Sequence, residues 1–269
     1  MTAEPAALLT LAETTAREAG AMVYQRREAV ERMDVAATKS TPTDVVTESD
    51  TAAEALIRDR LLAARPDDGI LGEEDGRTAG SSGVDWVVDP IDGTVNYLYG
   101  LPHYAVSIAA RVDGVVVAGV VHNPASGETW TATAGGGAYL DGRAISVTGC
   151  DQLGMAMVGT GFGYDAQRRA RQAAVLLELV PVVRDIRRAG AASLDLCAVA
   201  AGRLDAYYER GLQPWDVAAG ALIAEQAGAT VTGLHGAAPG EDLVLASAPG
   251  VVDELRSLLE RLGADRDTP

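Results

Sequence analysis

The stretch that decides the fold is Trp86-Val87-Val88-Asp89-Pro90-Ile91-Asp92-Gly93-Thr94-Val95-Asn96-Tyr97. Its first half is apolar and predicts a buried strand, which ends in two aspartates three residues apart. The Gly-Thr pair that follows predicts a turn of the backbone. Carboxylates at the end of a strand, next to free backbone N–H groups, suit a site for hard cations and a phosphate group. We therefore expect the rest of the chain to supply the remaining ligands and the walls of such a site.

The composition excludes several classes of protein. With 269 residues, the chain is long enough for one large domain or two modest ones with well-buried cores. Its formal net charge of −16 disfavours nucleic acids and anionic membranes as partners. Cys150 and Cys197, the two cysteines, have small or apolar neighbours and fit free thiols in a reducing cytoplasm. The N-terminus lacks a secretion-signal pattern and no apolar stretch approaches a membrane span, so we expect a cytoplasmic protein.

The N-terminal region predicts two helices and the loop between them. Residues 5–32 carry apolar side chains at helical spacing, which predicts one long helix packed over a sheet. The Ser, Thr and Pro residues within 36–50 predict a loop. Ser49-Asp50 is expected to cap a second helix over residues 51–64, and a capping role alone would explain Asp50.

The region that follows predicts mostly strands. A short strand over residues 70–72 ends in Glu73, and the Gly- and Ser-rich residues 75–83 predict a surface loop. The residues 112–114 predict a hairpin turn between two of the later strands. These later strands are expected at 105–109, 115–121, 129–133 and 138–140.

In the second half of the chain, strands and helices alternate, which predicts an α/β layer. Strands are expected at 155–160, 183–188, 205–209, 229–232 and 243–246. Helices are expected at 165–180, 193–201, 214–227 and 251–262. We therefore divide the chain into an N-terminal α+β unit, residues 1–150, with most of the candidate ligands, and a C-terminal α/β unit, residues 151–269, which adds Asp216.

Four acidic residues share one kind of position, the end of a strand or the start of a helix, after apolar residues: Glu73, Asp89, Asp92 and Asp216. Each has an ordinary explanation when taken singly, such as the helix dipole for Asp216. If they converge, two unit charges 4 Å apart at an effective dielectric constant near 20 repel by about 4 kcal/mol. Bound cations would relieve this repulsion, and ligands that are all oxygen select Mg²⁺, Mn²⁺ or Ca²⁺ over zinc.

The spacing of the acids also bears on the reaction. A covalent aspartyl-phosphate enzyme typically needs Asp-x-Asp after its strand, whereas this chain has Asp-x-x-Asp at Asp89 and Asp92. A water molecule activated by metal ions is then the expected nucleophile, oriented by Thr94 and a carboxylate. The N–H groups after Asp92 and those at Gly190-Ala191 are candidates for holding phosphate oxygens.

Three of these motifs resemble the signatures of the inositol monophosphatase family: Gly72-Glu73-Glu74, Asp89-Pro90-Ile91-Asp92-Gly93-Thr94 and Trp215-Asp216. Lys39-Ser40-Thr41-Pro42-Thr43-Asp44 and Glu209 fit the same pattern, and the resemblance extends from residue 5 to about residue 260. It implies an α/β (α+β) fold, a layered αβαβα sandwich of the inositol monophosphatase and fructose-1,6-bisphosphatase type. It also implies a homodimer, a need for two or three Mg²⁺ per site with Mn²⁺ as a possible substitute, and sensitivity to Li⁺.

The resemblance further implies roles for individual residues. Glu73 is expected to hold a first metal ion together with Asp89 and the Ile91 carbonyl, and also a third, looser one. The second metal ion is expected to bind Asp89, Asp92 and Asp216. The catalytic residues are expected to be Glu73, Thr94, Asp44 and Asp50, where Asp44 and Thr94 help to activate the water and Asp50 lies behind them. Substrate contacts are expected from Gly93, Thr94, Asp92, Gly190, Ala191, Ala192, Glu209 and Asp216, with Glu209 meeting hydroxyl groups.

The implied activity is hydrolysis of myo-inositol 1-phosphate to myo-inositol and phosphate. The stretches Gly190-Ala191-Ala192-Ser193 and Tyr207-Tyr208-Glu209-Arg210-Gly211 look most like the inositol-phosphate branch of the family. Ala191 departs from the pattern, because many members carry Thr or Ser there. The alternatives are a fructose-1,6-bisphosphatase or a histidinol-phosphatase of the same family, and a non-enzymatic, metal-stabilised regulatory partner.

Overall fold

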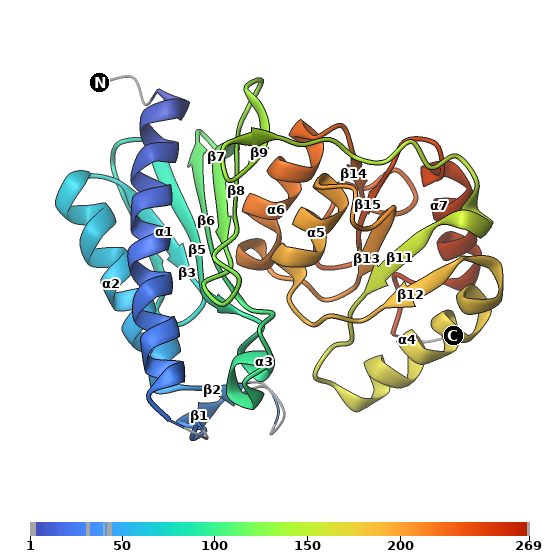
Figure 1. Cartoon of the computed structure of the whole chain (residues 1–269), viewed down its shortest axis with the longest axis horizontal. Helices are drawn as coiled ribbons and strands as arrows, with labels where there is room; N and C mark the ends of the chain where they lie inside the picture. Colours follow the sequence, from blue (N-terminus) through green and yellow to red (C-terminus); the bar gives the residue numbers. More distant parts are fainter. Residues whose placement is uncertain (1–3, 31–32, 40, 42–44, 268–269) are drawn as a thin grey trace.

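The computed structural model describes residues 4–30, 33–39, 41 and 45–267. Two β-sheets alternate with three helical layers along the long axis of the molecule, as Figure 1 shows. This arrangement confirms the predicted αβαβα sandwich. Within the described ranges, no helix has the length and apolar character needed to cross a membrane.

The first helical layer consists of α1 (Pro5–Glu28) and α2 (Glu48–Ala64). Helix α1 packs against strands of the first sheet through small side chains such as Ala12 and Ala16, both fully buried. It ends at Glu28, so the prediction that it reaches residue 32 was too long. Helix α2 begins earlier than predicted because its N-cap is Thr47, not Ser49-Asp50: the Asp50 carboxylate accepts the Thr47 N–H at 2.8 Å.

The second layer is an eight-stranded sheet with the order β10-β9-β8-β7-β6-β5-β3-β4, in which only β3 and β5 are paired in parallel. Its strands are β3 (Gly69–Gly72), β4 (Gly76–Thr78), β5 (Val84–Asp92), β6 (Ala105–Val112), β7 (Val115–His122), β8 (Thr129–Thr133), β9 (Gly137–Leu140) and β10 (Arg143–Ala144). Strand β4 lies inside the predicted loop 75–83, which is a correction: its three residues pair with β3 despite their polar sequence. A separate pair, β1 (Ala37–Thr38) and β2 (Val45–Val46), lies within the other predicted loop, 36–50.

The fourth and fifth layers are a five-stranded sheet and the helices outside it. The sheet has the order β12-β11-β13-β15-β14 and contains β11 (Met157–Thr160), β12 (Asp185–Arg187), β13 (Ala206–Glu209), β14 (Thr230–Thr232) and β15 (Val244–Ser247). The outer helices are α4 (Ala166–Leu179) and α7 (Val252–Leu262). Two short 3-10 segments, Leu153–Met155 and Val180–Val182, replace the ends of a predicted strand and of a predicted helix.

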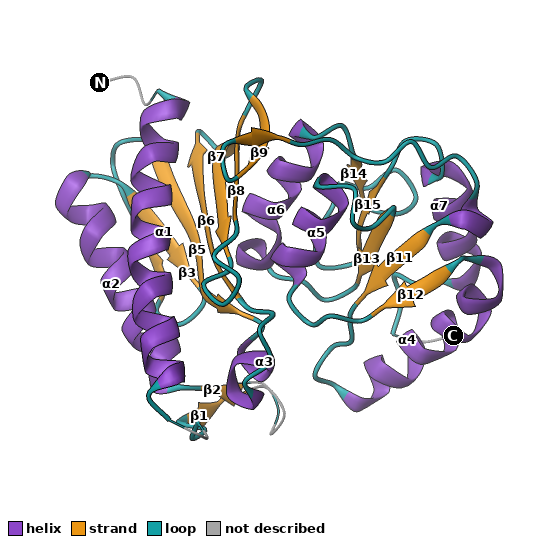
Figure 2. Ribbon diagram, in the orientation of Figure 1, coloured by secondary structure: helices purple, strands orange, loops and turns teal. Residues whose placement is uncertain are grey.

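The middle layer positions the candidate site. Its helices, α5 (Ala192–Ala200) and α6 (Pro214–Gln226), lie between the two sheets in Figure 2. Small residues allow close packing there: a Cβ atom at Gly119 of β7 would lie 3.0 Å from the Ala219 Cα atom. The first turns of both helices are thereby brought to the C-terminal end of β5. Because α6 also packs against the first sheet, the division of the chain at residue 150 stays a prediction.

Candidate active site

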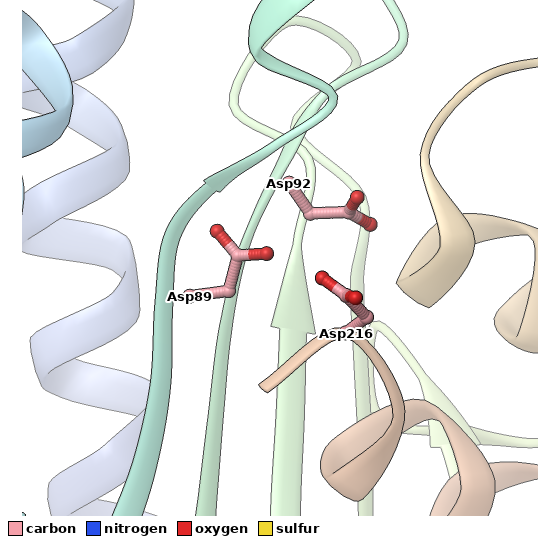
Figure 3. Close-up of side chains that lie close together, drawn as sticks. All are labelled: Asp89, Asp92 and Asp216. Atoms are coloured by element: carbon pink, nitrogen blue, oxygen red, sulfur yellow. The ribbon is translucent and has the colours of Figure 1, made fainter. Parts of the chain in front are cut away.

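Three carboxylates converge at the junction between the first sheet and the middle helices. Figure 3 shows Asp89 and Asp92 at the end of β5 and Asp216 at the start of α6, with their carboxylates directed toward one another. One oxygen from each lies within 4.8 Å of the others. Asp89 and Asp92 are buried, with 1% and 7% of their surface exposed, so water screens little of their mutual repulsion.

The end of β5 explains how both aspartates reach the same side. In a regular strand, residues three positions apart point to opposite faces. Here the pairing with β6 shifts between Asp89 and Asp92, and such a bulge changes the direction of a side chain. The Ile91 N–H donates to Asp89 Oδ1 at 3.0 Å, which holds the irregular turn in place.

The Asp92 carboxylate lies at the N-terminus of α5. It accepts hydrogen bonds from the Ser193 hydroxyl at 2.5 Å, the Ser193 N–H at 2.7 Å and the Ala192 N–H at 3.2 Å. The positive end of a helix stabilises an anion in this position. The Ala192 N–H, predicted to contact substrate, is therefore engaged by Asp92 in this structure. Ser193 was not predicted as a site residue, although a serine in the first turn of a predicted helix could have signalled it.

The other two acids that were predicted to bind metal, Asp216 and Glu73, also have defined partners. Asp216 Oδ2 accepts the Gln213 N–H at 2.7 Å, which caps α6. Glu73 makes a hydrogen-bond contact with Asp89 and an ion pair of 2.6 Å with Lys39. Asp216 thus both caps α6 and belongs to the carboxylate cluster.

A buried glutamate that the sequence did not reveal supports the position of Glu73. Glu54, on the inner face of α2, is fully buried and accepts the backbone N–H groups of Glu74 at 2.7 Å and Asp75 at 3.0 Å. Arg58 pairs with it at 2.8 Å, so the buried charge is balanced. The sequence did contain a signal for this role, because Glu54 is a charged residue among the apolar positions of α2, four residues after Asp50.

Thr94 lies between the metal cluster and a second buried acid. Its hydroxyl oxygen is 3.0 Å from Asp50 Oδ1 and 3.0 Å from the Ile91 carbonyl oxygen. Asp50 thus lies next to Thr94, and its catalytic role stays a prediction. Asp44, predicted to help activate the water, lies outside the described residues.

A cavity of about 710 Å³ opens over the three carboxylates and receives walls from both halves of the chain. Glu73, Gly93, Thr94, Gly190, Ala192 and Glu209 are among the residues that line it. Ala191 is predicted to contact substrate, but it is only 1% exposed and packs into the core beside α6. Glu209 accepts the Tyr207 hydroxyl at 2.5 Å, which orients one of its oxygens. Three arginines of the wall, Arg168, Arg188 and Arg210, were not predicted.

Burial and mutual repulsion raise the pKa values of the acids in this cavity. Burial raises the pKa of Asp89 well above its usual range, and the charges of Glu73, Asp92 and Asp216 raise it further. Burial raises the pKa of Asp92 to about 6, although the hydrogen bonds from Ser193 oppose the shift. Burial likewise raises the pKa of Glu209 to about 7. The site therefore disfavours its own ionised form unless positive charge is added.

This donor set fits hard divalent cations. The converging groups are carboxylate oxygens, which is the ligand chemistry of Mg²⁺ and Mn²⁺, and Ile91 lines the same cavity. Adding positive charge would relieve the repulsion that raises the pKa values.

Without metal ions, we expect the protein to lose stability as the pH rises from about 4 to about 7. Acids with raised pKa values bind more protons in the folded state, so their stabilising effect is present at low pH and lost as the pH passes about 6 for Asp92 and about 7 for Glu209. Calorimetric melting curves in a chelator would measure the decline. Mg²⁺ at about a hundred times its Kd should raise Tm at the higher pH by roughly 5 to 10 °C. A Tm in chelator that is constant or rises with pH would contradict this expectation.

Fold and site together define a class: a five-layer α/β protein with an acidic, metal-fitting cavity between its layers. The profile of the inositol monophosphatase family matches residues 4–268. The inositol-1-monophosphatase of Mycobacterium bovis is 51% identical over 99% of this chain and 98% of its own length. The chain belongs to the inositol monophosphatase family, as its motifs predicted.

Two further relatives extend the comparison. The solved structure of Mycobacterium tuberculosis SuhB is 50% identical and has a TM-score of 0.84, with 98% of this chain and 100% of that chain covered. A protein of Pseudomonas aeruginosa named Nus factor SuhB is 43% identical over 85% of this chain and 86% of its own length. The family supports a phosphatase for small phosphorylated substrates, and members of this family are generally metal-dependent.

Proposed function

We propose that this protein is a Mg²⁺-dependent phosphomonoesterase that hydrolyses myo-inositol 1-phosphate to myo-inositol and phosphate. The observation that carries the proposal is the convergence of Asp89, Asp92 and Asp216 on one wall of a cavity large enough for a small ligand. Mg²⁺, when bound, supplies charge that clamps the phosphate, activates water and stabilises the leaving alkoxide. The 51% identity to a mycobacterial inositol-1-monophosphatase supports the same substrate.

The residues of the cavity then take the following roles. When metal ions are bound, Glu73, Asp89 and the Ile91 carbonyl would hold one, Asp89, Asp92 and Asp216 would hold a second, and Glu73 would contribute to a third. Thr94, whose hydroxyl donates to Asp50 Oδ1 at 3.0 Å, would orient the attacking water by accepting a hydrogen bond from it, and its own proton would pass to the Asp50 carboxylate as the water gives up a proton to Thr94. The backbone of Gly93 and Thr94 receives the phosphate. Both residues line the cavity beside the carboxylates.

The opposite wall recognises the polyol. Because Oε2 of Glu209 accepts the Tyr207 hydroxyl at 2.5 Å, Oε1 is the atom that we propose for a substrate hydroxyl group. Gly190 lies on the same wall and allows close approach, since its φ of +92° is a conformation that favours glycine. We propose these two residues as the part of the site that selects a hydroxyl-rich substrate.

We also propose that the protein is a cytoplasmic homodimer inhibited by Li⁺. Tyr99 and Leu101, which follow the site stretch directly, are 74% and 52% exposed. Exposed apolar side chains of this kind are often covered by a partner surface. Light scattering that gives a monomer mass at micromolar concentration would contradict the dimer.

The test of the proposed substrate is a comparison of kcat/KM for myo-inositol 1-phosphate, fructose 1,6-bisphosphate and histidinol phosphate, with Mg²⁺ present. We expect the value for inositol phosphate to exceed the other two by at least about tenfold. A higher value for either alternative would assign the protein to that activity. Absence of phosphate release from every sugar or polyol monophosphate would refute the phosphatase proposal itself.

A second candidate is a regulatory function as a Nus factor, because a relative with 43% identity carries that name. The two candidates are separated by the Asp89→Asn variant in a strain that lacks its own copy of the gene. A phosphatase function requires turnover, so the variant should fail to restore the wild-type phenotype. Full restoration by a variant without measurable turnover would favour the regulatory function.

A further inference from the structure

Three residues that are distant in sequence form a charged cluster on the outer wall of the cavity. Arg168 belongs to the first turn of α4, Arg210 follows β13, and Asp267 lies five residues after the end of α7. Asp267 accepts from Arg168 Nε at 3.1 Å, from Arg210 Nε at 3.0 Å and from Arg210 Nη2 at 2.8 Å. Two guanidinium groups thus face a single carboxylate.

The cluster is built around Arg210. Its side chain is 13% exposed, and Nη1 donates to the Asp265 carbonyl at 2.7 Å and to the Asp242 carbonyl at 3.2 Å. These bonds hold the guanidinium in one orientation, with its Nε–Nη2 edge toward Asp267. By contrast, the Asp267 side chain is 42% exposed, so it is more easily displaced from the cluster than Arg210.

Besides pairing with Asp267, the two arginines line the cavity. Arg168 and Arg210 both line the space that opens over Asp89, Asp92 and Asp216. Lys39, another cation of the wall, already pairs with Glu73 and Glu74 at 2.6 Å each. Two arginines that converge on an anion with parallel N–H bonds form the arrangement that binds phosphate oxygens well. In this structure, the carboxylate of Asp267 is the anion to which both guanidinium groups donate.

We propose that Arg168 and Arg210 form a second anion subsite, suited to the distal phosphate of a sugar bisphosphate, and that the C-terminal Asp267 covers it. This inference deepens the proposed phosphatase function and rests on it, because the reacting phosphate is the one at the carboxylate cluster. A bisphosphate must displace Asp267 before its second phosphate can pair with the arginines. The tail therefore acts as a specificity element that favours monophosphates.

The first experiment measures kcat/KM for fructose 1,6-bisphosphate and for myo-inositol 1-phosphate in the wild type and in Asp267→Asn. We expect the ratio of the bisphosphate value to the monophosphate value to rise about five- to tenfold in the variant, since a charge-assisted competitor is removed. Asp253→Asn is the matched control, because Asp253 also pairs with an arginine at 2.6 Å, but that arginine, Arg256, does not line the cavity, whereas Arg168 and Arg210 do. An unchanged ratio in Asp267→Asn would overturn the proposal.

A double variant separates the subsite from a general charge effect. In Asp267→Asn with Arg168→Gln, one of the two guanidinium groups is gone, and we expect the ratio to return to within about twofold of the wild-type value. If the gain persisted in the double variant, it would come from the loss of negative charge alone, and the arginine subsite would be refuted.

A binding experiment keeps this inference distinct from the proposed function. A hydrolysis-resistant hexitol 1,6-bisphosphonate is titrated calorimetrically into each protein with Mg²⁺ present, beside the 1-monophosphonate. We expect Asp267→Asn to lower Kd for the bisphosphonate about five- to tenfold relative to the monophosphonate. If no phosphate ester were hydrolysed by any of the proteins, the proposed function would fail while this result still decided the subsite. Equal Kd ratios for the two proteins would refute the subsite even in an active phosphatase.

Discussion

Asp89→Asn should lower kcat for myo-inositol 1-phosphate by at least about a hundredfold, which corresponds to about 2.7 kcal/mol in the activation barrier. The reason is the position of Asp89, whose oxygens face Asp92, Asp216 and Glu73 at once. We have proposed it as a ligand shared by two metal ions, so neutralising it removes charge from both. Asparagine keeps the shape and still accepts the Ile91 N–H that is 3.0 Å away. Steady-state kinetics at saturating Mg²⁺ give the result.

The fold should survive this change, and its stability without metal should increase. Burial and neighbouring charges raise the pKa of Asp89, so the ionised form is disfavoured in the folded state and its removal relieves repulsion. Asp85→Asn is the matched control on the same strand: Asp85 pairs with Arg77 and Arg111 at 3.2 Å each and does not line the cavity. Wild-type turnover in Asp89→Asn at saturating Mg²⁺ would show that the assignment of Asp89 as a shared ligand is wrong.

Ser193→Ala should raise the Mg²⁺ concentration needed for half-maximal activity by about ten- to a hundredfold. Ser193 is fully buried, and its hydroxyl donates to Asp92 Oδ2 at 2.5 Å. This bond orients a proposed metal ligand and opposes the rise in its pKa. Alanine leaves the backbone N–H bond of 2.7 Å in place, so the helix remains joined to Asp92. Activity measured against Mg²⁺ concentration checks the prediction.

The pH dependence identifies the cause of this effect. Loss of the hydroxyl raises the pKa of Asp92 further above about 6, so protons compete with Mg²⁺ more strongly at low pH. The difference between Ser193→Ala and the wild type should therefore be larger near pH 6 than near pH 8. Ser257→Ala is the control, since that hydroxyl donates at 2.8 Å to a carbonyl on the exposed side of α7. Identical Mg²⁺ dependence in Ser193→Ala and the wild type at both pH values would contradict the orienting role.

Local pattern was sufficient for most of the elements. The apolar run before Asp89, the spacing along α1 and the proline at the start of α6 are features of short segments, and the structure confirms a strand and two helices there. The missed elements are short: β4 has three residues and α3 (Thr94–Tyr99) has six. Segments of this length are too short to display a helical or strand period, and their pairing partners decide them. The cap of α2 was misplaced by two residues for a similar reason, because three adjacent polar residues could each cap it.

The sequence by itself therefore determined the family, the layered fold and the set of acids, because all three follow from short motifs, each of which spans only a few residues. Only the tertiary structure decided which groups hold those acids. Ser193 reaches Asp92 across 101 positions, and Asp267 reaches Arg168 across 99. Such contacts depend on how closely the layers pack, as at Gly93, where a Cβ atom would lie 3.1 Å from the Ala191 Cβ atom. No local pattern encodes that distance. The hydrogen bond from Ser193 to Asp92 and the pairing of Asp267 with the arginines therefore appear only when the sheets and helices are packed together.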